Sequence, residues 1–163
     1  MLELKKALID LISNRVLVCA VFAWMLAQIL KIFTSPKYRQ GMSFLRFVVG
    51  SGGMPSSHAA TVSATAFSCG ILYGYDTGIF AVAAILAVVV MRDAAGIRRE
   101  AGKQAEVINH ISEELNKEKK KPTFEETLKV LLGHTPLQVL CGALLGVMMA
   151  FFCQHWLFLK IYL

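Results

Sequence analysis

The chain has 163 residues, a formal net charge of +6 and a hydrophobic content of 56%, and its mean hydropathy is +0.57. A soluble domain of this length carries far less apolar surface, so the composition excludes a water-soluble globular protein. The positive charge does not indicate nucleic-acid binding, because the basic residues lie between apolar runs rather than along one polar surface. We therefore expect a single all-α membrane domain over residues 1–163 and no nucleic-acid partner.

Residues 1–13 alternate Leu and Ile with Glu, Lys and Asp at helical spacing. This amphipathic pattern predicts a helix that lies on the membrane surface rather than across it. Four longer apolar segments follow, at residues 16–33, 59–75, 78–91 and 136–159. A hydrocarbon layer about 30 Å thick needs roughly 17 to 25 residues of helix, so these segments predict about four transmembrane helices. The sequence thus indicates an integral helical bundle that crosses the cell membrane several times, with a short or tilted third helix.

Between the third and fourth apolar segments lies a polar stretch, residues 92–133. Its acidic and basic residues recur at helical spacing, which predicts an exposed helix with charge pairs along it. The lysine-rich run at residues 117–121 is typical of a solvated loop. We expect this polar helical loop to be inserted before the last transmembrane helix.

The ends of the predicted helices that carry polar motifs all lie on one face of the membrane. Lys31 ends the first transmembrane helix, His58 begins the second, Asp93 ends the third and His134 begins the fourth. Hairpin connections between successive helices place these four ends together. Basic residues are also more numerous on this face, and positively charged loops tend to stay inside the cell. We therefore predict that this face is cytoplasmic.

A glycine- and serine-rich segment, residues 50–58, precedes the second transmembrane helix. The free amides of a helix N-terminus bind anions, so Gly53, Ser56 and Ser57 are candidates for holding a phosphate group. The alternative is that one of the serines only caps the helix. A second motif, Gly-His-Thr-Pro at residues 133–136, places another histidine at a helix start. Two such histidines on one face, with arginines between them in the sequence, indicate a catalytic site.

These motifs resemble those of the type 2 phosphatidic acid phosphatases, in particular their divergent branch, a family that shares its core with the vanadium haloperoxidases. Pro-Ser-Ser-His at residues 55–58 is similar to the family's Pro-Ser-Gly-His, which supplies a hydroxyl and an acid histidine. The segment at residues 133–139, followed by Gly142 and Gly146, is similar to a later family motif. The resemblance covers residues 50–147.

The resemblance implies a phosphatase whose nucleophile is His134 and whose general acid is His58. An imidazole can attack phosphorus and exchange protons near neutral pH, which divides one difficult displacement into two steps. Cations and amides would stabilise the charge on the phosphoryl oxygens. The candidates for this binding role are Lys31, Gly53, Ser56, Ser57, Arg92, Arg98 and Arg99.

Three positions depart from the family pattern. Gln138 occupies the place of the aspartate that orients the nucleophile, Leu128 occupies that of an arginine, and no Arg-Pro pair follows Lys31. Glutamine accepts a hydrogen bond from an imidazole but cannot stabilise an imidazolium as a carboxylate does. We therefore give Gln138 a supporting role behind the nucleophile. Asp93 is expected to replace the missing carboxylate, and the arginines at 92–99 the missing arginine.

The predicted activity is that of a phosphoric monoester hydrolase, which cleaves a lipid or isoprenoid phosphate through a phosphohistidine without a metal or another cofactor. The predicted partners are the bilayer and a membrane lipid phosphate. Two alternatives remain open, a transporter or flippase for lipid phosphates and a membrane protein that binds them without catalysis. Gly142 and Gly146 have a spacing at which two helices pack closely, which permits a homodimer.

Overall fold

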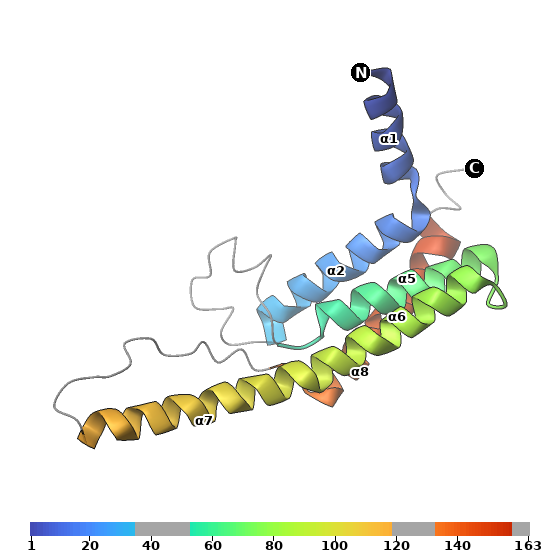
Figure 1. Ribbon diagram of the computed structural model, residues 1–163. Helices are drawn as coiled ribbons and strands as arrows, with labels where there is room; N and C mark the ends of the chain where they lie inside the picture. The colour runs from blue at the N-terminus through green and yellow to red at the C-terminus, as the bar shows by residue number, and fades with distance from the viewer. Residues whose placement is uncertain (35–52, 119–132, 158–163) are drawn as a thin grey trace.

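The computed structural model describes residues 1–34, 53–118 and 133–157, and these residues are almost entirely helical. The helices are α1 (Leu2–Ser13), α2 (Arg15–Thr34), α5 (Ser57–Tyr73), α6 (Gly78–Ala95), α7 (Ile97–Glu118) and α8 (Pro136–Phe152), followed by a π-helical turn at Cys153–Leu157. No strand occurs in the described ranges. The prediction of an all-α bundle is confirmed (Figure 1).

Among the described residues, three helical stretches are long and apolar enough to cross a membrane: Arg15–Thr34, Gly78–Glu114 and Pro136–Trp156. The remaining predicted crossing, the second in chain order, is α5, which has 17 residues. At 1.5 Å per residue it would be about 26 Å long. The third predicted helix is longer than expected, because α6 continues to Ala95 and α7 follows directly.

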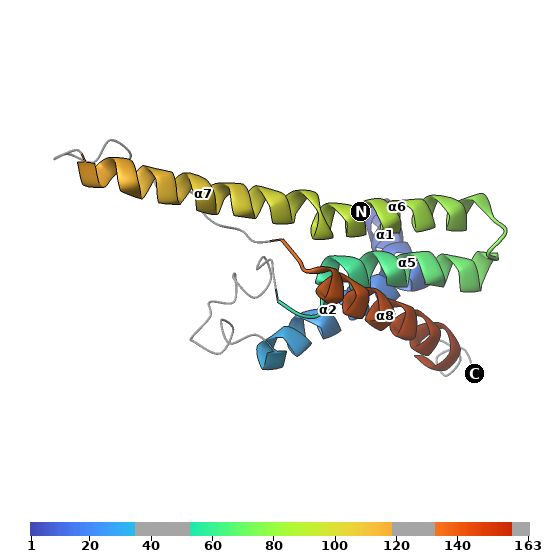
Figure 2. The same ribbon diagram turned by 90° about the horizontal axis from the view of Figure 1, so that it is seen from below.

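The centre of the bundle is α5, which packs against α2, α6 and α8. Figure 2 shows α5 between α6 on one side and α2 and α8 on the other. The core consists mainly of small side chains, among them Ala23, Ala27, Ala60, Ala64 and Ala150, all fully buried. Small residues suit a membrane bundle, because close backbone approach replaces the hydrophobic driving force that lipid does not supply.

The two glycines of α8 mark its closest approach to α5. A Cβ atom at Gly142 would overlap the carbonyl oxygen of Ser56, and one at Gly146 would overlap that of Ala60. Both glycines are buried. This face is therefore occupied by α5 within one chain, and the homodimer stays a prediction. The spacing correctly indicated close helix packing, but the partner is α5.

Two helices extend beyond the bundle, as Figure 1 shows. The N-terminal helix α1 is exposed along its length and is joined to α2 by Asn14, whose Oδ1 accepts a hydrogen bond from the Leu17 amide at 3.1 Å. At the other end α7 continues outward from α6 and carries the ion pair Lys103–Glu100 and a contact of 3.8 Å between His110 Nδ1 and Glu114. The predicted polar helix is thus present. Lys117, which was predicted to lie in a loop, belongs to this helix, and residues 119–121 lie outside the described ranges.

Candidate functional site

Four helix ends meet at the end of the bundle from which α7 departs. The amide of His134, just before α8, donates to the carbonyl of Ala94 near the end of α6, at 3.0 Å. The amide of Ser56, just before α5, donates to the carbonyl of Gln138 in the first turn of α8, also at 3.0 Å. The last turn of α2 joins them, since Lys31 Nζ donates to Ser57 Oγ at 3.0 Å. These bonds fix the positions of the side chains that we call the histidine cluster: Lys31, Ser57, His58, His134 and Gln138.

Lys31 is a fully buried cation. Taking an ammonium group out of water costs several kcal/mol unless a partner compensates for the lost hydration. The hydrogen bond of Lys31 goes to the neutral hydroxyl of Ser57, and no carboxylate of the described residues forms an ion pair with it. A charge within a membrane helix under these conditions makes Lys31 a candidate for a functional role. The chemistry of Lys31 suits an anion bound next to Ser57.

The start of α5 separates the roles of its two serines. Ser56 is the N-cap, and its hydroxyl accepts a hydrogen bond from the Ala59 amide at 3.4 Å. For Ser56 the capping alternative is therefore what the structure shows. Ser57, by contrast, accepts from Lys31 and is buried. Gly53 precedes them at φ +78°, a conformation that favours glycine.

His134 is 4% exposed, and its ring lies beside that of His58 with the centroids 6.1 Å apart and the planes at 62°. Its Nδ1 is 3.3 Å from Gln138 Oε1. The other nitrogen, Nε2, is buried and forms no hydrogen bond of regular geometry in the described part of the chain, although the Gly53 backbone lies near the ring. His58 is exposed. The pair thus combines a buried imidazole that has an unengaged nitrogen with a second imidazole open to the surroundings.

The electrostatic environment favours the neutral form of the His134 ring. Burial lowers the pKa of His134, and the nearby charges of Lys31 and His58 lower it further. The hydrogen bond to Gln138 and the backbone of Gly53 act in the opposite direction but do not prevail. A neutral imidazole keeps one nitrogen lone pair, which is the requirement for a nucleophile.

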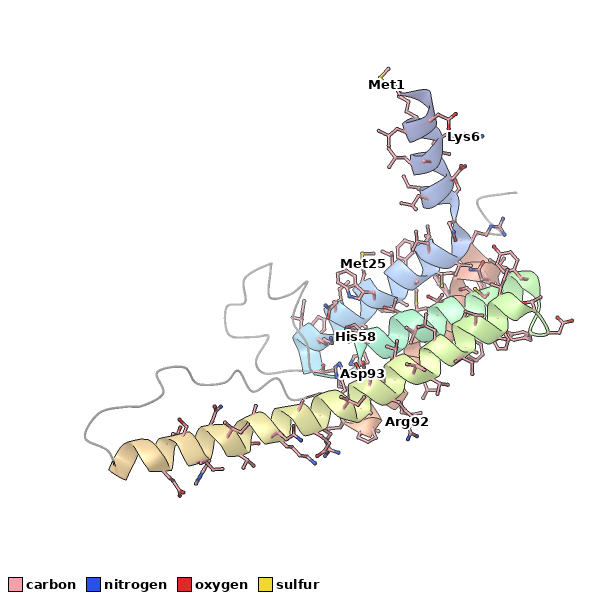
Figure 3. The ribbon with its side chains drawn as sticks, viewed as in Figure 1. Met1, Lys6, Met25, His58, Arg92 and Asp93 are labelled. Carbon is pink, nitrogen blue, oxygen red and sulfur yellow. The ribbon has the colours of Figure 1, made fainter. Side chains whose placement is uncertain are left out.

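The residues predicted on α6 and α7 are only partly gathered at this site. Asp93 is half-buried and lies on the side of α6 toward His58, whereas Arg92 points to the opposite side (Figure 3). Arg92, which was expected to bind the phosphate, is exposed and lines an open pocket of about 420 Å³ with Val88 and Met91, so the structure does not bring it into the cluster. Consecutive helix residues point about 100° apart, so both could not face the cluster. Arg99 is half-buried on α7, and the Arg98 side chain is outside the described part.

One contact at the site could not be predicted from sequence motifs. The carbonyl of Ala94 holds the amide of His134, and a backbone acceptor leaves no mark in the side-chain pattern. Asp93 was expected to supply the carboxylate that orients His134, but the side chain that contacts Nδ1 of His134 is that of Gln138. Across the described residues, no group of three or more His, Cys, Asp or Glu side chains is placed to hold a metal ion.

Together the bundle and the histidine cluster define a helical membrane protein whose polar groups gather at one end. The chain belongs to the divergent PAP2 family, whose family model matches residues 12–149. It is similar to "Uncharacterized membrane protein YuiD" of Bacillus subtilis (strain 168), with 36% identity over 152 residues, or 86% of this chain and 94% of that protein. No solved structure is significantly similar. The resemblance inferred from the motifs is confirmed.

Proposed function

We propose that the protein hydrolyses a lipid phosphate monoester through a phosphohistidine on His134. The observation that carries the proposal is the Nε2 atom of His134, which is buried without a hydrogen-bond partner among the described residues next to a buried ammonium group. A structural histidine would satisfy both of its nitrogens, because a buried unpaired polar atom costs about 1–3 kcal/mol. A phosphoryl group placed between Lys31 and His134 would remove this cost.

The binding step uses the charge of Lys31. A phosphate monoester carries its negative charge on oxygens that an ammonium group and hydroxyl donors stabilise well. Lys31 and Ser57 would hold these oxygens, and the amides that precede α5 would add donors at the positive end of its dipole. The half-buried Arg99 is the further cation that we assign to binding, whereas Arg92 points away from the cluster.

The chemical step divides the work between the two histidines. The lone pair on Nε2 of His134 forms the bond to phosphorus, while the bond from phosphorus to the lipid oxygen breaks and His58 donates a proton to that oxygen. Water then attacks the phosphohistidine, His58 accepts its proton, and inorganic phosphate leaves with His134 restored. The exposure of His58 fits this role, because the acid must reach the side on which the lipid alcohol departs.

The test is phosphate release by the purified protein in detergent from phosphatidate, phosphatidylglycerophosphate and polyprenyl phosphate. His134→Ala and His58→Ala should each lower release by at least about 100-fold. The matched control is His110→Ala, because His110 is an exposed histidine on α7 that contacts Glu114 at 3.8 Å and is not part of the histidine cluster. This variant should keep the wild-type rate.

The outcomes separate the proposal from its alternatives. Loss of release in both site variants but not in His110→Ala supports the phosphatase. Absence of release from every lipid, with binding of the lipid phosphate retained, would overturn it in favour of a transporter or flippase. Loss of both release and binding would leave a membrane protein that does not act on lipid phosphates.

A further inference from the structure

Gln138 contacts two donors of the same short segment with a single atom. Its Oε1 accepts a hydrogen bond from the Thr135 amide at 3.0 Å and lies 3.3 Å from Nδ1 of His134. The Thr135 hydroxyl accepts in return from the Gln138 amide at 3.3 Å, which completes a capping box at the start of α8. The orientation of Gln138 is therefore fixed from both sides.

This geometry determines which form of His134 is present. A backbone N–H can only donate, so the side-chain atom of Gln138 that faces Thr135 must be its oxygen rather than its nitrogen. An oxygen without hydrogen can in turn only accept from Nδ1 of His134. The ring must then carry its proton on Nδ1, and Nε2 carries the lone pair. A neutral imidazole with this tautomer presents its nucleophilic nitrogen to the cluster.

We infer that Gln138 is the positioning residue that locks His134 in the neutral Nδ1–H tautomer, so that the protein uses an uncharged amide to prepare its nucleophile. The catalytic part of this inference rests on the proposed function. The contact itself stands on the hydrogen bonds of Gln138.

Gln138 carries no charge, and this affects the protonation of His134 because charged groups surround its ring. Lys31 of α2 and His58 of α5 both oppose a positive charge on the ring, and burial lowers the pKa of His134 in the same direction. From α6, the ionisable residue on the side toward His58 is Asp93 (Figure 3). A carboxylate at position 138 would attract the imidazolium from α8 itself. The amide supplies the acceptor without that attraction, so the ring remains unprotonated at lower pH.

The decisive variant is Gln138→Glu, which keeps an acceptor for both donors and also a residue that forms capping boxes. An adjacent opposite charge moves a pKa by about 1–3 units. We therefore expect the acidic limb of the kcat/KM profile for phosphate release to move upward by about one pH unit or more, with about tenfold lower rates below it. The control is Thr135→Ala, which removes the cap hydroxyl but keeps the Gln138 contact with His134. It should lower stability without moving the limb.

A second measurement does not depend on activity. ¹⁵N-histidine NMR of the protein in detergent micelles reports which ring nitrogen carries the proton, and the chain has only four histidines to assign. We expect Nδ1–H for His134 in the wild type and a higher titration midpoint in Gln138→Glu. An Nε2–H tautomer, or an unchanged midpoint, would overturn the inference. If no lipid phosphate is cleaved but the tautomer is as expected, the proposed function fails and the positioning role stands.

Discussion

Replacing Gly142 with alanine would separate the two helices that frame the histidine cluster. The added Cβ would overlap the carbonyl oxygen of Ser56 and lie 3.0 Å from the Cβ of Ala59. Both obstacles belong to α5 or its N-cap, and a backbone carbonyl cannot rotate away as a long side chain would. Helix α8 must therefore shift outward. Overpacking of this kind costs about 1–3 kcal/mol.

The shift would also affect the site, because the Ser56 amide donates to Gln138 in the adjoining turn. We expect thermal unfolding in detergent to occur at a lower temperature, by about 2–4 °C for each kcal/mol lost. Phosphate release should fall as well, since His134 moves with the start of α8. Gly146→Ala lies one turn farther from the cluster and should lower stability with a smaller effect on release.

The matched control for this prediction is Gly78→Ala at the start of α6. A Cβ atom there meets nothing within 4 Å, and alanine is favoured over glycine in helices. Its unfolding temperature should therefore be unchanged or slightly higher. Equal destabilisation by Gly78→Ala and Gly142→Ala, or none by Gly142→Ala, would refute the argument that α5 and α8 pack through glycine.

Three further predictions address the charge, the chemistry and the orientation of the site. Lys31→Met should lower phosphate release by about 100-fold or more through loss of charge stabilisation. Its unfolding temperature should stay the same or rise, because a buried cation is removed. A stable variant with full activity would exclude Lys31 from the site. Vanadate, which mimics phosphate, should inhibit release, and prior treatment with EDTA should leave release unchanged; loss of activity on chelation, restored by a metal, would contradict a reaction that relies on protein cations. A cysteine introduced as His110→Cys on α7 should react with a membrane-impermeant maleimide in inside-out vesicles and not in right-side-out vesicles; the reverse labelling would place the histidine cluster on the outer face.

The sequence allowed the helices and their polar ends to be predicted because hydropathy and helix-start motifs are local signals. Lys31, His58 and His134 each stand at the end of an apolar run, and successive crossings alternate in direction, which places these three ends on one face of the membrane. The side of a helix on which a residue lies was harder to predict. Helix α6 is apolar almost all round, so no polar stripe indicated that Asp93 would face the bundle and Arg92 the outside.

The helix that packs against the two glycines of α8 also could not be predicted from the sequence. The spacing of Gly142 and Gly146 indicates close contact, but a second chain and another helix of the same chain present equally small surfaces to it. Only the fold shows that α5 fills this place. In the same way, the role of Gln138 depends on its contact with the Thr135 amide, and no residue type reveals such a backbone partner.

Because the His134 amide is hydrogen-bonded to the Ala94 carbonyl, the chain between these two residues leaves the bundle and returns to it at one point. Both of its ends are held at one point of the bundle, so lengthening the chain after α7, at residues 119–132, alters mainly the entropy of closing the chain between them. Each doubling of loop length costs only about 0.6 kcal/mol. A reporter domain or a purification tag inserted at residues 119–132 should therefore leave His58 and His134 in place. This segment is thus the natural place to attach a probe.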